Sequence, residues 1–168
     1  MKLSKKSFKS PFGTFLIVAN PDSIVALLLP NQETETFERA VENKNHPILK
    51  QCEAELKEYF AGSRKEFTVP VSGAGTEFQT KVWNELMKIP FGETTSYLKQ
   101  ARRMKKEKAV RAVAGAHSKN PIPILVPCHR VIASDGRLHG YAGGISLKKK
   151  LLEIEGLSIQ NDRVIPKR

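Results

Sequence analysis

The sequence has few of the features that mark membrane-spanning or disulfide-bonded secreted proteins. Its longest apolar runs, such as residues 24–29, are far shorter than the roughly 20 residues that cross a bilayer. The N-terminus carries lysines but lacks the apolar core of a signal peptide. Only two cysteines occur, Cys52 and Cys128, and two cannot make a disulfide framework. We therefore expect a cytoplasmic protein in a reducing compartment, where a free thiol survives.

Sequence motifs for common cofactors and metals are also missing. The chain contains neither a GxGxxG fingerprint nor a Walker loop. Its cysteine and histidine residues do not have the spacing of zinc ligands, because the one close pair is adjacent in sequence. Internal repeats and low-complexity segments are absent as well. The sequence therefore predicts a protein without a cofactor or a metal.

The charge of the chain is strongly positive and unevenly distributed. Its 168 residues suffice for one ordinary domain or two small ones, and 40% apolar and 27% charged residues suit a globular protein. The net charge is +11. Up to Gly73 there are ten Lys/Arg against nine Asp/Glu, whereas from Ala74 onward there are eighteen against eight. The basic surplus in the second half indicates either a polyanionic partner or a solvated basic surface.

The first half shows strand patterns followed by a helical one. Two apolar runs, 12–20 and 23–30, flank an Asn-Pro-Asp turn and predict a hairpin. Residues 31–46 are polar and predict a loop. Residues 46–62 have helical spacing with Cys52 on the apolar stripe, which makes Cys52 a core residue. A short strand over 66–71 is expected to lead into a linker, which places the domain boundary between residues 73 and 74.

The second half predicts mostly helices. Thr76 can cap a helix over 77–89 whose apolar face includes Met87. Short helices over 97–104 and 108–117 carry many cations and predict a helix-turn-helix. A glycine-rich loop then precedes a final helix, which Ser146 is expected to cap.

The stretch NPIPILVPCHRVIAS, residues 120–134, reads as a buried strand with Cys128, His129 and Arg130 near its end. A thiolate is a nucleophile, and a neighbouring base can take the proton of the thiol. His129 is the nearest candidate base, although adjacent residues on a strand point to opposite faces. Contact therefore requires a bridging water or an irregular backbone after Pro127. Glu155 is one of few acids in this half that could orient the imidazole.

Several stretches together carry a resemblance to a known family. The core PCHRV lies within IPILVPCHRVI, and GTEFQTKVWNELMKIPFGETTSY, AVRAVAGAHSKNP, GYAGG and KKKLLEIEG agree with the family in order and spacing. Over about residues 10–156 the chain resembles the O6-alkylguanine-DNA alkyltransferases, also called methylated-DNA–protein-cysteine methyltransferases. It looks most like the short bacterial-type members.

The resemblance implies an α+β fold with two domains. Residues 1–73 would form a small α/β supporting domain, a strand hairpin plus helix, which is ribonuclease-H-like. Residues 74–168 would form a mostly helical, winged helix-turn-helix-like domain for DNA binding and alkyl transfer. The implied function is DNA repair by a monomeric, single-turnover methyltransferase. It would flip O6-alkylguanine, chiefly O6-methylguanine with O4-alkylthymine as a further candidate, out of duplex DNA and transfer the alkyl group irreversibly to its own cysteine.

The resemblance also implies roles for residues at the reacting centre. Cys128 matches the alkyl acceptor, and His129 matches the residue that takes the thiol proton through a water. Glu155 matches the hydrogen-bond partner of that histidine. Asn120 matches the residue that braces the turn between the recognition helix and the active-site strand.

Other matched positions would bind the DNA or the extruded base. Arg111 matches the side chain that fills the space of the extruded base, and Tyr97 matches the residue that contacts the guanine and crowds the adjacent phosphate. The small residues Ala112 and Gly115 would let the recognition helix approach the minor groove. The remaining positions would surround the base, through an aromatic side chain on the pocket-closing loop or through the backbone: Tyr141, Cys128, Val131 and Ala142.

The chain departs from the family pattern in the helix-turn-helix. Gln100 and Arg103 stand at positions that are usually apolar, and Lys105-Lys106-Glu107 replaces a Gly-Asn-Pro-like turn. Without a glycine for a left-handed residue, we expect a shifted or longer helix. Its inner face would consist of Leu98, Ala101 and Met104.

Two residues and two rival functions remain open at this point. His139 either narrows the range of alkyl groups or points to solvent, and Arg130 is expected to form a salt bridge near the last helix. The main alternative is an alkyltransferase-like module that binds lesions with weak or no transfer, against which the presence of Cys128 speaks. A cysteine hydrolase is the second alternative, but no hydrolase signature supports it.

Overall fold

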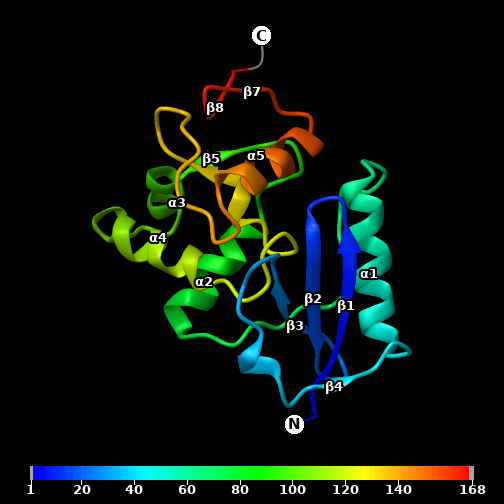
Figure 1. Ribbon diagram of the computed structural model, residues 1–168. Coiled ribbons are helices and arrows are strands. Elements are labelled where there is room, and N and C mark those ends of the chain that lie inside the picture. Colours follow the sequence, from blue (N-terminus) through cyan, green and yellow to red (C-terminus); the bar gives the residue numbers. More distant parts are fainter. Residues whose placement is uncertain (1, 167–168) are drawn as a thin grey trace. The chain divides into compact units, whose positions relative to one another are not determined.

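The computed structural model describes residues 2–166, which form two compact units (Figure 1). The first unit holds the chain up to Ala74 together with Pro121–Leu125, so the chain returns to it once. The second unit holds Gly75–Asn120 and the chain from Val126 onward. The fold is α+β, as predicted: strands dominate the first unit and helices the second.

The first unit is built on a sheet of four strands in the order β3-β2-β1-β4. The predicted hairpin is confirmed, since β2 (Gly13–Ala19) and β3 (Ile24–Leu28) pair antiparallel. An antiparallel strand β1 (Ser4–Ser10) precedes them, and the short β4 (Val41–Glu42) joins β1 in parallel. We did not predict β1 because its sequence, SKKSFKS, offers little apolar alternation.

The two faces of β2 are both buried, which explains its nearly continuous apolar sequence. Phe15 faces the helix α1, where its ring lies 5.4 Å from that of Phe60. On the opposite face, Leu16 and Val18 form a cluster with Ala26, against which the partly buried Phe37 packs. Phe37 belongs to the short 3₁₀ turn η1 (Glu35–Phe37), within the segment predicted as a loop.

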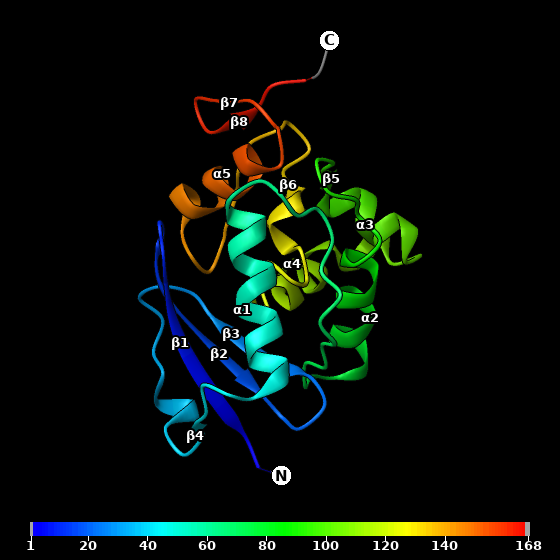
Figure 2. The ribbon, with the colours of Figure 1, turned by 90° about the vertical axis from the view of Figure 1, so that its right-hand side faces the viewer.

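The helix α1 (Pro47–Phe60) covers one face of this sheet (Figure 2). The His46 imidazole caps it by accepting a hydrogen bond from the Ile48 amide, and Pro47 occupies the first turn, where its missing N–H costs nothing. Cys52 is fully buried on the inner face, as predicted. Burial raises the pKa of this thiol well above its usual range, which makes it unreactive.

The strand predicted over residues 66–71 is not formed. Only Val71 makes a β-bridge, to Ile24. The buried carboxylate of Glu55 instead accepts hydrogen bonds from the backbone amides of Thr68 and Val69, at 2.7 and 3.2 Å. These bonds hold the segment against α1 without a sheet.

The helix α2 (Glu77–Leu86) opens the second unit with the predicted cap. Thr76 and Gln79 form a capping box, with reciprocal bonds of 3.1 and 3.0 Å. Trp83 is buried and donates its indole N–H to the carbonyl of Ala116 at 2.9 Å, which ties α2 to α4. Met87, the C-cap residue of α2, is exposed, contrary to expectation.

The predicted helix-turn-helix is present as α3 (Tyr97–Arg103), the 3₁₀ turn η2 (Glu107–Ala109) and α4 (Val110–Ser118). We expected a shifted or longer helix, but α3 ends at Arg103 with Met104 as its C-cap, so it is not longer than the helix predicted over 97–104. Lys105 adopts the left-handed conformation itself, at φ +57°, so the turn forms without a glycine. Ala101 is buried as predicted, but the other fully inward residue of α3 is the polar Gln100.

The remaining elements lie within or after the apolar segment that begins at residue 120, apart from the short strand β5. Residues 120–127 do not form the predicted strand. A 3₁₀ turn, η3 (Cys128–Arg130), leads into β6 (Val131–Ile132), which pairs in parallel with β5 (Thr95–Ser96). The helix α5 (Ile145–Ile154) follows, and a hairpin of β7 (Ile159–Gln160) and β8 (Arg163–Val164) closes the unit.

The final helix begins one residue before the predicted cap. Ser146 does not cap α5, because the helix already begins at Ile145 after Gly144, which takes φ +90° and provides no side-chain cap. Among residues 2–166, no helix has the length and apolarity needed to cross a membrane.

Candidate active site

Cys128 lies at the first position of the η3 turn, directly after Pro127. Its side chain is buried, with 8% of its surface exposed. Burial raises the pKa of the Cys128 thiol, whereas a hydrogen bond from Asn120 and the charge of Lys148 oppose that rise. The thiol is thus held protonated at rest, close to groups that favour the thiolate.

His129 and Glu155 form a buried pair behind this turn. The imidazole Nε2 lies 2.6 Å from Oε2 of Glu155, and both side chains are inaccessible to solvent. The irregular backbone of η3 replaces the strict alternation of a strand, so sequence neighbours need not face opposite sides. Burial lowers the pKa of His129 although Glu155 counteracts it, so the imidazole stays neutral and can accept a proton.

Glu155 follows the last residue of α5 and receives several hydrogen bonds. Arg130 donates to its two oxygens, at 2.8 and 3.2 Å, and the Gly92 amide donates at 3.0 Å. Burial alone would raise the pKa of Glu155, but the bonds and charges of His129 and Arg130 outweigh it and lower the pKa to about 2. The predicted salt bridge of Arg130 near the last helix is confirmed.

Asn120 braces the backbone that leads to the thiol. Its side-chain amide donates to the carbonyl of Val126 at 2.9 Å and so links the two ends of the segment 121–125. Ile124, within that segment, takes φ +75°. A side chain that bonds both Val126 and Cys128 fixes the position of the thiol relative to the end of α4.

Lys148 is a buried residue of this site that the sequence analysis missed. Its ammonium donates to the carbonyls of Val131, at 2.7 Å, and His139, at 3.1 Å. Burial lowers the pKa of Lys148 to about 8, and the thiolate form of Cys128 would oppose that effect. The sequence did contain a pattern that predicts this burial. One helix face with the spacing i, i+3, i+4, i+7 is formed by Lys148, Leu151, Leu152 and Glu155, so this lysine lies on the inward face.

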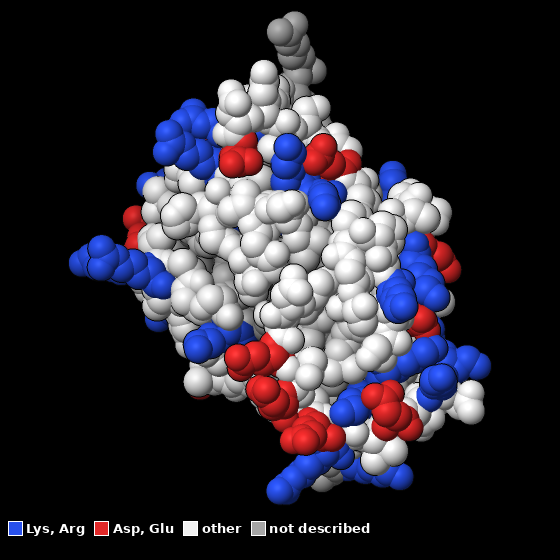
Figure 3. Space-filling model, in the orientation of Figure 1, with Lys and Arg blue, Asp and Glu red and all other residues white. Residues whose placement is uncertain are grey.

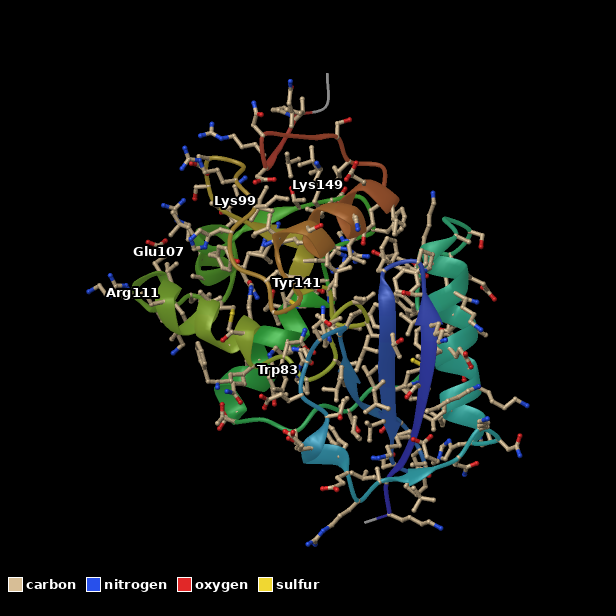
Figure 4. The ribbon with its side chains drawn as sticks, viewed as in Figure 1. Trp83, Lys99, Glu107, Arg111, Tyr141 and Lys149 are labelled. Atoms are coloured by element: carbon tan, nitrogen blue, oxygen red, sulfur yellow. The ribbon has the colours of Figure 1, made fainter. Side chains whose placement is uncertain are left out.

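Two tyrosines lie close enough to Cys128 to interact with its charge. Burial raises the pKa of Tyr97 to about 12, and the Cys128 charge adds to this. Burial and the charges of Cys128 and Glu155 raise the pKa of Tyr141, on the loop before α5 (Figure 4). Tyr97 donates its hydroxyl to the carbonyl of His139 at 2.9 Å. The hydroxyl of Tyr141 is buried and has no hydrogen-bond partner among residues 2–166.

The predicted DNA-facing residues of α4 are exposed together. Arg111, Ala112 and Gly115 all lie at the surface, and a Cβ on Gly115 would meet no atom within 4 Å. Packing within the described chain therefore does not require a small residue there. Arg111 projects away from the body of α4 (Figure 4), and cations extend from the surface over α4 and the turn before it (Figure 3).

The last predicted residues occupy different environments. The side chain of Val131 is buried in β6, and its carbonyl accepts the Lys148 bond. Ala142 and His139 are exposed on the loop before α5, and this exposure favours the alternative in which His139 points to solvent. In the part of the chain that the structure describes, no cluster of His, Cys, Asp or Glu could hold a metal ion.

Two domain families match the chain, one over each unit. Residues 3–72 match the ribonuclease-like domain of 6-O-methylguanine DNA methyltransferase, and residues 77–157 match its DNA-binding domain. The pair of matches defines an alkyltransferase with both domains. The expected ribonuclease-like character of the first unit is thereby confirmed.

Individual relatives give the same answer over most of the chain. The constitutive methylated-DNA–protein-cysteine methyltransferase of Bacillus subtilis is 43% identical over 154 residues, which cover 89% of this chain and 93% of the relative. The enzyme of that name from Methanosarcina acetivorans is 41% identical over 151 residues, covering 89% and 96%. The chain belongs to the methylated-DNA–protein-cysteine methyltransferase family.

Solved structures agree with the fold. The structure of Mycobacterium tuberculosis OGT in complex with DNA superimposes with a TM-score of 0.84 at 37% identity. The match covers 90% of this chain and 92% of that one. An O6-methylguanine DNA methyltransferase from Methanococcus jannaschii matches with a TM-score of 0.66 at 28% identity, covering 93% and 96%.

Proposed function

We propose that this protein repairs DNA by transferring the alkyl group of O6-alkylguanine to the sulfur of Cys128. The observation that carries the proposal is that Cys128, His129 and Glu155 are all buried, with the imidazole of His129, the residue after Cys128, 2.6 Å from the carboxylate of Glu155. The names of the relatives and the solved complex of a relative with DNA support it.

The reaction follows from the protonation states of the site. His129, kept neutral by burial, takes the thiol proton through a water, and Glu155 stabilises the imidazolium that forms. The thiolate attacks the alkyl carbon, a C–S bond forms, and the C–O6 bond breaks with its electron pair left on guanine. The proton held by the His129 imidazolium then passes to the guanine, which stays in the DNA as an ordinary base. Since a thioether is stable, each molecule reacts once.

Asn120 and Lys148 favour the thiolate in this scheme. Both lower the pKa of Cys128 against the effect of burial, one by a hydrogen bond and the other by its charge. The burial that raises the thiol pKa also strengthens these interactions, because they act in a medium of low dielectric constant. A thiol held this way stays protected until a substrate fills the site.

The DNA side of the proposal rests on α4. The O6 atom of a paired guanine lies inside the base stack, so the base must rotate out to meet a buried thiol, at a cost of a few kcal/mol. Arg111 would fill the gap that the base leaves, while Ala112 and Gly115 allow close approach to the minor groove. Binding of this kind reads shape and phosphates, which suits a search for damage in any sequence.

The proposal extends to the organisation of the chain. Residues 1–73 support residues 74–168, which bind DNA and carry out the transfer. Tyr97, Tyr141 and the backbone of Val131 and Ala142 would surround the extruded base. The protein would act as a monomer in the cytoplasm.

Intact-mass measurement tests the proposal directly. The protein is incubated with a duplex that carries O6-methylguanine. A mass gain of one CH2, located on the Cys128 peptide and saturating at one equivalent, is expected. Cys128→Ala should abolish the gain and keep DNA binding, whereas Cys52→Ala, the matched control at the other buried thiol, should react normally. Retained DNA binding without any gain in mass would instead identify a lesion-binding module.

A further inference from the structure

A polar pair is buried inside the helix-turn-helix and has no part in the reaction described above. Nε2 of His117, on α4, lies 2.6 Å from Oε1 of Gln100, on α3. Gln100 is 2% exposed and His117 is 9% exposed. The transfer of polar side chains from water into the protein interior costs free energy, whereas a pair of apolar side chains could fill the same space without that cost. The pair therefore calls for a reason beyond packing.

The hydrogen bonds of Gln100 determine which nitrogen of His117 carries the proton. The amide Nε2 of Gln100 donates to the carbonyl of Val82 at 3.2 Å, which fixes the orientation of the amide. Its Oε1 can only accept, so the facing Nε2 of His117 must be the N–H donor. The imidazole is then the Nε2–H tautomer, and Nδ1, which has no hydrogen-bond partner among the described residues, carries a lone pair.

The ring held in this way packs against Tyr97. The two ring centroids are 5.1 Å apart, with planes inclined by 37°. The other end of Tyr97 is fixed as well, because its hydroxyl donates to the carbonyl of His139 at 2.9 Å. Tyr97 is therefore held at its hydroxyl by the loop before α5 and along its ring by His117.

We propose that Gln100 locks the tautomer and orientation of His117, and that His117 in turn positions Tyr97 for the extruded base. Both are positioning residues, and the inference rests on the proposed function, in which Tyr97 meets the guanine. A hydrogen bond has a preferred direction, which apolar packing lacks. The bond from His117 to Gln100 therefore fixes how far the imidazole is rotated about its Cβ–Cγ bond.

The state of the imidazole suits this role. Burial lowers the pKa of His117 to about 4, and the nearby charge of Lys148 acts in the same direction. The groups that these interactions place near the ring are a neutral amide, a tyrosine ring and a cation, and none of them carries a negative charge. At neutral pH the ring carries one proton, whose position Gln100 decides.

Nitrogen-15 NMR of the histidine side chains tests the tautomer without DNA. We expect His117 to show a protonated Nε2 and an unprotonated Nδ1, with an Nε2 proton that exchanges slowly because it is buried. His117→Phe assigns the signals. A protonated Nδ1, or equal populations of the two tautomers, would overturn the proposal. This result does not depend on whether the protein transfers alkyl groups.

Single-turnover kinetics tests the effect on Tyr97. In Gln100→Leu, which conserves volume, we expect mixed tautomers, an alkyl-transfer rate at saturating damaged duplex about tenfold to a hundredfold lower, and unchanged affinity for undamaged duplex. Gln51→Leu, the same change at a helix residue of the first unit that also bonds a side chain, should keep the wild-type rate. A wild-type rate in Gln100→Leu would overturn the role.

A double variant keeps the test decisive if Gln100→Leu folds poorly. Gln100→Leu/His117→Phe removes both polar groups and leaves neither unpaired. We expect it to fold and to transfer no more slowly than the slower single variant, because both changes remove one interaction. Fully additive losses would mean that the two residues act separately, which contradicts the proposal. Absence of transfer in the wild-type protein would instead refute the proposed function and leave the tautomer result standing.

Discussion

Arg130 and Glu155 form a buried, two-pronged ion pair, with Nε and Nη2 of the guanidinium 2.8 and 3.2 Å from the two carboxylate oxygens. Oε2 of the same carboxylate also faces His129. Glu155 is therefore held ionised by a group outside the proposed reaction. A carboxylate shared in this way remains an anion beside the imidazole, and its position does not depend on the protonation of His129.

Removal of the guanidinium should destabilise the protein strongly. Arg130→Met leaves Glu155 buried without its main cationic partner, and breaking a buried pair in this way costs about 3–5 kcal/mol. Urea unfolding followed by circular dichroism measures the loss. Arg64→Met, which breaks the more exposed pair with Glu58, should cost under about 1 kcal/mol. Equal losses in the two variants would mean that the buried pair adds nothing beyond a surface contact.

Acid should weaken the fold through His117. Its pKa falls from the ordinary 6.5 to about 4 on folding, so between these values the unfolded chain binds more protons than the folded one. Stability is therefore present above pH 6.5 and is lost as the pH falls toward 4, by up to about 3 kcal/mol at 1.4 kcal/mol per pH unit. Burial lowers the pKa of His129 as well, which adds in the same direction.

The matched measurement is the free energy of unfolding against pH in the wild-type protein and in His117→Phe. The variant should lose the part of the slope that His117 contributes and keep the part from His129. An unchanged slope between pH 4 and 6.5 would show that His117 is not held neutral by its surroundings.

The turn of the helix-turn-helix offers a pair of matched substitutions. Lys105 has φ +57° and Lys106 has φ −131°. The left-handed conformation costs an ordinary residue roughly 1–2 kcal/mol, so Lys105→Gly should stabilise the protein by about 1 kcal/mol. Lys106→Gly removes the same charge at a residue of negative φ, where glycine gains no conformational advantage, and should destabilise it by about 0.5–1 kcal/mol. Thermal unfolding of the two variants distinguishes them, and shifts of the same sign would contradict the assignment.

The same turn illustrates what the sequence could and could not predict. The helices on either side follow from caps and apolar spacing, which are local properties. The turn does not, because its conformation depends on how α3 and α4 pack rather than on a glycine at position 105. Gln100 also escaped prediction: a polar residue is assigned outward unless its partner is known, and His117 lies 17 residues further along.

The active-site segment shows a similar division. Cys128, His129 and Glu155 could be chosen from residue types and the family resemblance, and the salt bridge of Arg130 could be anticipated. The backbone between Asn120 and Cys128 could not, since an apolar run bounded by prolines does not distinguish a strand from an irregular buried segment. The burial of Lys148 could have been predicted only by applying the helical spacing of α5 to a charged residue.

The orphan hydroxyl of Tyr141 should matter for substrate and not for stability. It is buried without a hydrogen-bond partner among residues 2–166, so Tyr141→Phe removes an unpaired polar group. We expect unfolding to be unchanged or shifted toward higher stability by about 1 kcal/mol. If the extruded base supplies the missing partner, transfer at saturating DNA should slow. A loss of stability above about 1 kcal/mol would mean that the hydroxyl is bonded in the folded protein.

Lys148 should set the pH at which the thiol becomes reactive. Its charge opposes the rise that burial imposes on the Cys128 pKa, so Lys148→Met removes one of the groups that favour the thiolate. The rate of alkyl transfer, or of alkylation by iodoacetamide, should then rise only at higher pH than in the wild-type protein. Lys150→Met, at an exposed position of the same helix, is the control and should keep the wild-type profile.

Two carbonyls lose a donor in Lys148→Met, so the profile must be measured where the variant is fully folded. A slower reaction with the same pH midpoint would mean that Lys148 only holds β6 and the loop before α5 in place. Its charge would then have no effect on the pKa of the Cys128 thiol.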